Sequence, residues 1–267
     1  MTEASTATEV APYEKRAASV VLITALMGTG KTTTGDYLAE YCGMHDLDGD
    51  NILHHGVTDR PEWEQAAGDI TKALYEHWLK GEPAPEALWH PYVDTLCVQM
   101  QEALQRHGRI VVSWAIYRRE VRDFLRQRMN CRLQFIRLDC ETDVLVQGAL
   151  ARLQEGLDMS KMSTADWWAS EDPAMQNCGG RKKYGEFSFK SFKQMQLENA
   201  LHGMVAFGDD EPDALAVDVT SRDSSAFHRV SAALGLPPAS EEVDIAKVTP
   251  ALKPKTFARS TAAEPWV

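Results

Sequence analysis

The sequence lacks the features that mark several common classes of protein. Its 28 basic residues are outnumbered by 39 acidic ones, so the net charge is −11, and a nucleic-acid partner, which needs a broad basic surface, is not expected. No apolar run approaches the roughly 20 residues that cross a bilayer, so no membrane partner is expected. The five cysteines include no C-x-x-C pair. Neither a zinc site nor a disulfide framework is therefore expected, and a reducing, cytoplasmic location is favoured.

Other absences narrow the class further. Residues 1–17 are polar, with no periodicity, and the first 16 carry three glutamates, which predicts a disordered segment and not a signal peptide. No internal repeat is present. The chain has no N-K-x-D guanine motif, so a nucleotide switch of the GTPase kind ranks last. With 267 residues, of which 44% are hydrophobic, the chain can form one α/β domain with a sizeable core.

What the sequence does contain is a strand, a glycine-bearing loop and a helix start over residues 19–34. Residues 19–24 are apolar and β-branched, which is typical of a buried parallel strand. Gly28 and Gly30 allow a tight turn whose N–H groups point at an anion. Lys31 offers a charge to outer phosphates and Thr32 a hydroxyl to Mg²⁺. This is a Walker A loop, with Ala25 where the pattern has its first glycine. The residues expected to contact the nucleotide here are Met27, Gly28, Thr29, Gly30, Lys31, Thr32 and Thr33.

The order of apolar segments predicts an α/β fold of three layers. The expected strands are residues 19–24, 44–47, 109–113, 133–138 and 214–219. Helical patterns separate them, so we expect a five-stranded parallel sheet with helices on both faces. Ligands of such sheets bind beyond the carboxyl ends of the strands. The loop, the segment after residue 47 and the segment after residue 113 should therefore converge.

Three aspartates alternate at the end of the second strand, at Asp46, Asp48 and Asp50. A calcium loop is excluded, because its sixth position would be Asn51 and its twelfth Val57. Beside a phosphate loop, one carboxylate can hold the metal shell and another can orient or deprotonate an attacking hydroxyl. We assign these functions to the pair Asp48 and Asp50 rather than to Asp46; a solvated turn is the alternative.

Several segments carry a more specific resemblance. After A-L-M-G-T-G-K-T over residues 25–32 comes Leu47-Asp48-Gly49-Asp50, closely followed by a histidine. Residues 114–126 are similar to C-S-A-L-K-x-x-Y-R-D-x-L-R. In these motifs the chain resembles the gluconate kinase family, small-molecule kinases related in fold to shikimate kinase. The likeness covers about residues 18–235.

The resemblance implies an enzyme that uses Mg²⁺ and transfers the γ-phosphoryl group of ATP to a hydroxyl of a sugar acid. Gluconate is the leading candidate for that acceptor. It implies catalytic roles for Lys31, Asp48, Asp50 and Arg122, and metal ligands Thr32 and Asp48. It implies that Arg152 closes over the nucleotide. The residues it implies for the small anionic acceptor are Asp50, His54, His55, Arg118, Arg119 and Arg122. Arginine forks suit carboxylate and phosphate oxygens, which favours the same reading; the alternative for residues 118–126 is a solvated basic helix face.

The chain departs from the family in three ways. The acidic run after G-x-P-L is absent, Gly148 stands where the family has its first lid arginine, and the lid is a long insertion at residues 154–190. Another polyol or hydroxy acid as acceptor therefore stays open. So does a degenerate P-loop protein that binds nucleotide and regulates. We expect a kinase domain over residues 18–236 and an irregular tail over residues 237–267. The assembly state is open, and a homodimer is one reading.

Overall fold

The computed structural model describes residues 18–49, 73, 77, 82, 84–156, 189–221, 223–237, 239 and 242–248. Of residues 152–156, 189, 192 and 246 the backbone alone is described.

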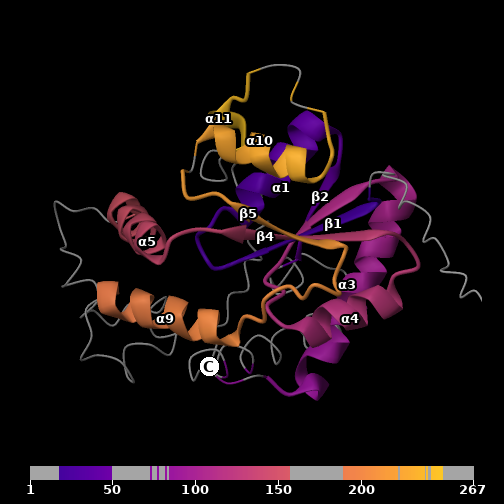
Figure 1. Cartoon of the computed structure of the whole chain (residues 1–267), viewed down its shortest axis with the longest axis horizontal. Coiled ribbons are helices and arrows are strands. Elements are labelled where there is room, and N and C mark those ends of the chain that lie inside the picture. The colour runs from indigo at the N-terminus through magenta and orange to yellow at the C-terminus, as the bar shows by residue number, and fades with distance from the viewer. Residues whose placement is uncertain are drawn as a thin grey trace, which may run out of the picture.

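The described strands form one parallel sheet of five, in the order β2–β3–β1–β4–β5 (Figure 1). The strands are β1 (Val20–Ala25), β2 (His45–Asp48), β3 (Ile110–Ser113), β4 (Leu133–Asp139) and β5 (Ala214–Asp218). Each predicted strand is present within one residue at either end. β1 lies at the centre because its six residues are all buried, whereas β2 and β5 form the edges.

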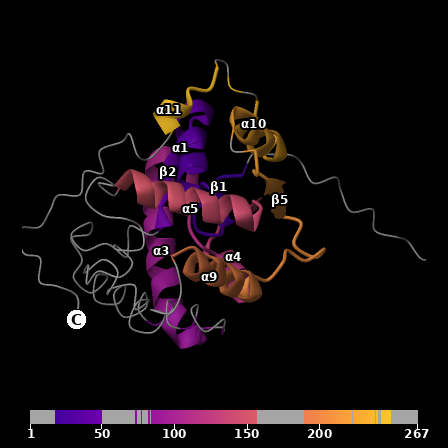
Figure 2. The ribbon, with the colours of Figure 1, turned by 90° about the vertical axis from the view of Figure 1, so that its left-hand side faces the viewer.

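Helices cover both faces of the sheet, which confirms the predicted α/β architecture. The described helices are α1 (Lys31–Cys42), α3 (Glu86–His107), α4 (Arg119–Arg128), α5 (Thr142–Gly156), α9 (Phe189–Gly203), α10 (Ser224–Ala233) and α11 (Ile245–Val248). Figures 1 and 2 show α1, α10 and α11 on one face, and α3 and α4 on the other. The helix predicted over residues 192–207 ends earlier, at Gly203.

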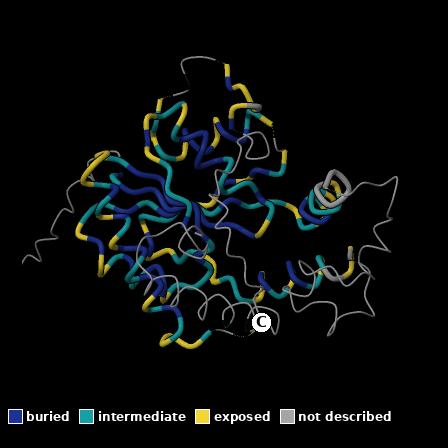
Figure 3. Tube along the Cα trace, turned by 180° about the vertical axis from the view of Figure 1, so that it is seen from behind, coloured by how far each residue is buried: buried dark blue, intermediate teal, exposed yellow. Residues whose placement is uncertain are grey.

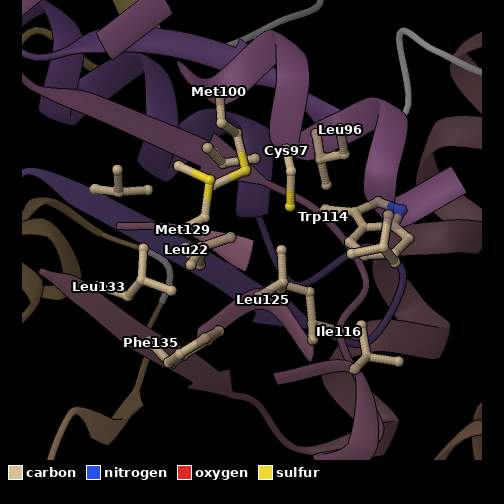
Figure 4. Close-up of a cluster of buried hydrophobic side chains, with 14 of the residues drawn as sticks. Leu22, Leu96, Cys97, Met100, Trp114, Ile116, Leu125, Met129, Leu133 and Phe135 are labelled. Carbon is tan, nitrogen blue, oxygen red and sulfur yellow. The ribbon is translucent and has the colours of Figure 1, made fainter. Parts of the chain in front are cut away.

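The two-residue period of the strands separates the core into two layers. Val20 and Leu22 of β1 pack toward α3 and α4, in the cluster that Figure 4 shows around Leu125 and Phe135. Val21 and Ile23 pack toward α1 and α10. Figure 3 shows the resulting band of buried strands at the centre of the molecule. Because helices cover both faces of the sheet, a ligand can reach the strands only at their ends. In sheets of this kind ligands bind at the carboxyl ends.

A third, smaller cluster joins the loop after β1 to α5 and α9. Leu26, the first residue after β1, is 5% exposed and packs with two residues from each of those helices. These are Leu145 and Val146 of α5 and Leu197 and Ala200 of α9. Figures 1 and 2 show α5 and α9 side by side. Leu26 therefore fixes these helices next to the loop.

The segment predicted to be an irregular tail includes ordered structure. Val243 and Val248 are buried against the α1 side of the core, and residues 245–248 form α11. The backbone N–H of Asp244 donates a hydrogen bond to the hydroxyl of Tyr41 at 2.9 Å. Among the described helices, none is both long and apolar enough to cross a bilayer. The described cysteines, Cys42, Cys97, Cys131 and Cys140, are free thiols.

Candidate functional site

The loop between β1 and α1 has the geometry that its glycines predict. Gly28 and Gly30 have φ angles of 84° and 103°, in the left-handed region that favours glycine. Gly30 is the N-cap of α1 and offers no side-chain hydrogen bond to the first turn. An anion at this point would face the positive end of the helix dipole. The residues predicted to contact the nucleotide lie in this loop and first turn: Met27, Gly28, Thr29, Gly30, Lys31, Thr32 and Thr33.

Thr29 provides the test of whether these residues fit a phosphate. Its side chain is 6% exposed, and its hydroxyl has no hydrogen-bond partner in the part of the chain that the structure describes. A buried hydroxyl without a partner costs about 1–3 kcal/mol, which an incoming anionic oxygen would recover. The loop thus contains a buried hydroxyl for which a phosphate oxygen would be a suitable partner.

Lys31 lies over the same loop. Its ammonium donates to the carbonyl oxygens of Ala25, at 2.9 Å, and Leu26, at 3.3 Å. The hydroxyl of Tyr117, in the segment after β3, donates to the same Ala25 oxygen at 3.1 Å. The Ala25 carbonyl therefore keeps one donor when the ammonium turns toward a ligand.

Asp48 and Ser113 form the wall beside the loop. They are paired in register at the ends of β2 and β3, and Ser113 pairs in turn with Ile23 of β1. The Ser113 hydroxyl is buried and donates to the carbonyl of Lys31 at 3.1 Å. Asp48 is thus aligned with the residue that contacts the start of α1.

The close approach of α1 to this wall explains Gly35. A Cβ there would lie 2.4 Å from Oδ1 of Asp46 and 2.7 Å from Oγ of Ser113. Because side chains alternate along a strand, Asp48 faces the same side as Asp46, toward α1. Asp48 therefore lies at the end of β2 on the side that faces α1, and its role as a metal ligand stays a prediction. Within the described residues no group of three or more His, Cys, Asp or Glu could hold a metal. An Mg²⁺ ion at Thr32 and Asp48 would need water and phosphate oxygens as its other ligands, which is how Mg²⁺ is usually held.

Gly49 has a packing role that the sequence did not indicate. A Cβ at this position would lie 2.6 Å from Cβ of Trp114, so only glycine fits without a shift. The hydroxyl of Tyr92, on α3, donates to the Gly49 carbonyl, and the Tyr92 and Trp114 rings lie 4.8 Å apart. The segment that leads to Asp50 is therefore held from both α3 and the end of β3.

Several predicted site residues lie outside the described residues. These are Asp50, His54 and His55, together with most of the 154–190 insertion. Arg152 lies on α5, but its side chain is not described. Their roles stay predictions.

Arg122 corrects the prediction for the acceptor side. Its side chain is 0% exposed and makes a two-pronged ion pair with Glu211, at 2.8 Å from Nε and 2.7 Å from Nη2. Its guanidinium also lies 4.9 Å from the ring centre of Phe207. The arginine holds the pKa of the Glu211 carboxyl down, at about 2. A guanidinium enclosed in this way is not presented to a ligand, so the expected contact with the acceptor is wrong.

The other arginines of this segment also have partners within the chain. Arg119 pairs with Asp210 at 2.9 and 2.7 Å, and Arg126 with Asp213 at 2.9 and 2.7 Å. Arg118, at the N-cap of α4, contacts Glu120 at 2.8 Å. Arg122 is thus held inside the molecule and Arg126 partly so, whereas Arg118 and Arg119 form their ion pairs at the surface, as the solvated alternative expects of them. A signal for this was present in the sequence: the acidic run at residues 209–213, just before β5, complements the basic helix.

The site consists of a glycine-bearing loop between β1 and α1, at the carboxyl edge of a five-stranded parallel sheet. No protein-family model matches the chain, and no curated protein matches it in sequence. Among solved structures, it is similar to a gluconokinase from Sinorhizobium meliloti 1021, at 20% identity and a TM-score of 0.48, over 82% of this chain and 93% of that one. It is also similar to a sugar kinase from Janibacter sp. HTCC2649, at 19% identity and a TM-score of 0.49, over 83% of this chain and 96% of that one. These names describe those two proteins.

Proposed function

We propose that this chain is an ATP-dependent kinase that phosphorylates a hydroxyl of a small anionic molecule. The observation that supports it best is the loop after β1. Two left-handed glycines, the buried Thr29 hydroxyl, the Lys31 ammonium and the start of α1 all belong to the stretch of residues 28–31. Donors and positive charge gathered in this way suit phosphate oxygens.

Mg·ATP would supply the phosphoryl group. The loop N–H groups and the Thr29 hydroxyl would hold phosphate oxygens, and Lys31 would leave its carbonyl partners to neutralise the outer phosphates. Thr32 and Asp48 would hold Mg²⁺, consistent with the position of Asp48 at the end of β2. Such positioning and charge stabilisation account for most of the catalysis in phosphoryl transfer.

On the acceptor side, Asp50 would accept the proton of the attacking hydroxyl. The hydrogen bond from Tyr92 to the Gly49 carbonyl supports this, because it fixes the residue before Asp50. Arg118, His54 and His55 would bind the anionic group of the acceptor, with Arg119 at the edge. The sequence resemblance makes a sugar acid, and gluconate in particular, the first acceptor to test.

The test is an assay of ADP release with ATP, Mg²⁺ and a panel of sugar acids and polyols. We expect one acceptor to raise ADP release well above the background with water. Lys31→Met should lower turnover about 100-fold or more, which is the scale of losing one electrostatic contact to the transition state. Asp50→Asn should lower turnover far more than ATP affinity. An enzyme whose turnover is unchanged by Lys31→Met would contradict the proposal.

A second function is favoured by the correction at Arg122. Glu211 pairs with Arg122, and Asp210 pairs with Arg119. The acceptor side therefore has fewer cations for a ligand than the sequence predicts. A P-loop protein that binds nucleotide and regulates a partner would not need them. In the same assay, tight ATP binding that depends on Lys31, with no acceptor raising ADP release, would favour this second function.

A further inference from the structure

The helix that follows the 154–190 insertion brings another lysine to the loop. Lys193 of α9 has its Nζ atom 3.9 Å from the Sδ atom of Met27. Met27 directly precedes Gly28 and is 47% exposed, so it marks the open side of the loop. Lys193 is therefore next to the loop, although the two are separated by 166 positions in the sequence.

The packing of α9 fixes this position. Leu197 and Ala200 hold Leu26, and Lys193 lies four and seven residues before them, on the same face of the helix. Lys193 thus extends, toward the opening of the loop, the same helix face that grips the residue after β1. The lysine side chain can move only as far as its stem allows, and its helix is anchored to the loop itself.

The Lys193 ammonium is also held by a neighbour on α9. It donates to Oε1 of Gln196 at 2.9 Å, and Gln196 is 2% exposed. A buried amide that accepts from the ammonium helps to orient it beside the loop. Lys31, Lys193 and the positive end of the α1 dipole are thus brought to one loop, an arrangement that would attract a multiply charged anion.

The geometry points to Lys193 as a second phosphate-binding residue, which contacts the nucleotide's phosphates from the side opposite β2. This rests on the proposed function, because it requires a nucleotide in the loop. It predicts selectivity for phosphate chains of high charge. Removing the lysine should weaken ATP more than ADP, and ADP more than AMP.

The test is calorimetric titration of the full chain with ATP, ADP and AMP, each with Mg²⁺. We expect Lys193→Met, which keeps the length of the side chain, to weaken ATP about tenfold and AMP hardly at all, which is the scale of one charge-assisted hydrogen bond. Lys193→Arg should restore most of the affinity. The loss should shrink at high salt.

The matched control is Lys247→Met. Lys247 lies on α11, near the Tyr41 end of α1 and so about 15 Å of helix away from the loop. This variant removes the same charge and should bind ATP as the native chain does. Melting temperatures of all variants separate local effects from unfolding.

The outcomes are distinguishable. If Lys31→Met weakens ATP and Lys193→Met does not, the inference about Lys193 is overturned and the proposed function stands. An equal loss for ATP and AMP would also overturn it, because the lysine would then act by placing α9. If neither lysine affects ATP, the proposed function and the inference fail together.

Discussion

Two regions at the carboxyl edge of the sheet both carry basic side chains, and they use them differently. At the loop after β1, Lys31 contacts the neutral carbonyls of Ala25 and Leu26. On α4, Arg122 contacts the carboxylate of Glu211, and both side chains are almost fully buried. A lysine that leaves a neutral carbonyl to bind a phosphate leaves no charge without a partner. An arginine that leaves a buried carboxylate would leave that negative charge without its main partner, at a high cost in free energy. The partner of a cation, more than its residue type, decides whether it can serve a ligand.

The loop and α4 are nevertheless connected. The backbone N–H of Val205 donates to the carbonyl of Tyr117 at 2.8 Å, and the Tyr117 hydroxyl contacts Ala25. Arg122 contacts the carbonyls of Val205 and Ala206, each at 3.4 Å. The ion pair thus supports the segment that reaches the loop. The two regions therefore differ in role. The α4 region supports the loop from behind, whereas the loop is the part that we propose binds the ligand.

The substitution Arg122→Met tests this contrast most strongly. It leaves the buried Glu211 with Arg126, at 2.8 Å, as its remaining basic partner. We therefore expect a loss in the free energy of unfolding that approaches but does not exceed the roughly 3–5 kcal/mol of an uncompensated buried charge. ATP affinity of the folded protein should stay within about twofold of the native value, because the change does not touch the loop. Urea denaturation and calorimetric titration measure the two quantities.

The control for that variant is the pair Arg122→Met with Glu211→Met. Removing both charges should recover part of the lost stability, since no buried carboxylate is then left without its arginine fork, and Arg126 keeps its contact with Asp213. A large fall in affinity for ATP or for the acceptor, with native stability, would return Arg122 to the binding site and end the contrast.

Acid should weaken the α4 side of the molecule. The pKa of Glu211 is about 2 in the folded protein, against an ordinary value of 4.5. A lowered carboxyl pKa means that this contribution to stability is complete above pH 4.5 and is lost as the pH falls from 4.5 toward 2. We therefore expect the free energy of unfolding of the native chain to decline more steeply in that window than that of Glu211→Gln. Parallel declines in a series of denaturation curves would contradict the ion pair.

The smallest expected effect sharpens the role of the residue before Asp50. Tyr92→Phe removes the hydroxyl that donates to the Gly49 carbonyl, and we expect a loss of about 1 kcal/mol in stability. Turnover should fall while ATP affinity is kept. Tyr41→Phe is the matched control, because it removes a hydroxyl at the far end of α1. Equal turnover in the two variants would show that Gly49 needs no such support.

The sequence was sufficient for the fold because local signals and the sheet agree. The apolar β-branched runs fall on β1, β3 and β4, and the glycines of the loop take the left-handed angles that their spacing predicts. Gly30 and Lys31 could be placed at the start of α1 for the same reason. These features depend on neighbours within a few residues, so a single sequence contains them.

What the sequence could not supply are contacts between distant segments. Arg122 and Glu211 are 89 positions apart, and Tyr117 and Ala25 are 92 apart. An arginine gives no local sign of whether its partner is a ligand or a glutamate of its own chain. The sequence places Gly49 only within the motif of Asp48 and Asp50, although the neighbouring Trp114 side chain requires a glycine there. Charge complementarity between residues 209–213 and α4 was the one available clue to the first of these contacts.

The ordered part of the C-terminal segment sets a practical limit on shortening the chain. Val248 is fully buried and packs in the same cluster as Leu38, and Asp244 is tied to Tyr41. Cutting at residue 236, where the sequence alone places the end of the domain, would strip this cover from α1 and expose an apolar surface to water. Such a fragment would invite aggregation, so any shortened version intended for crystallisation should keep residues up to 248.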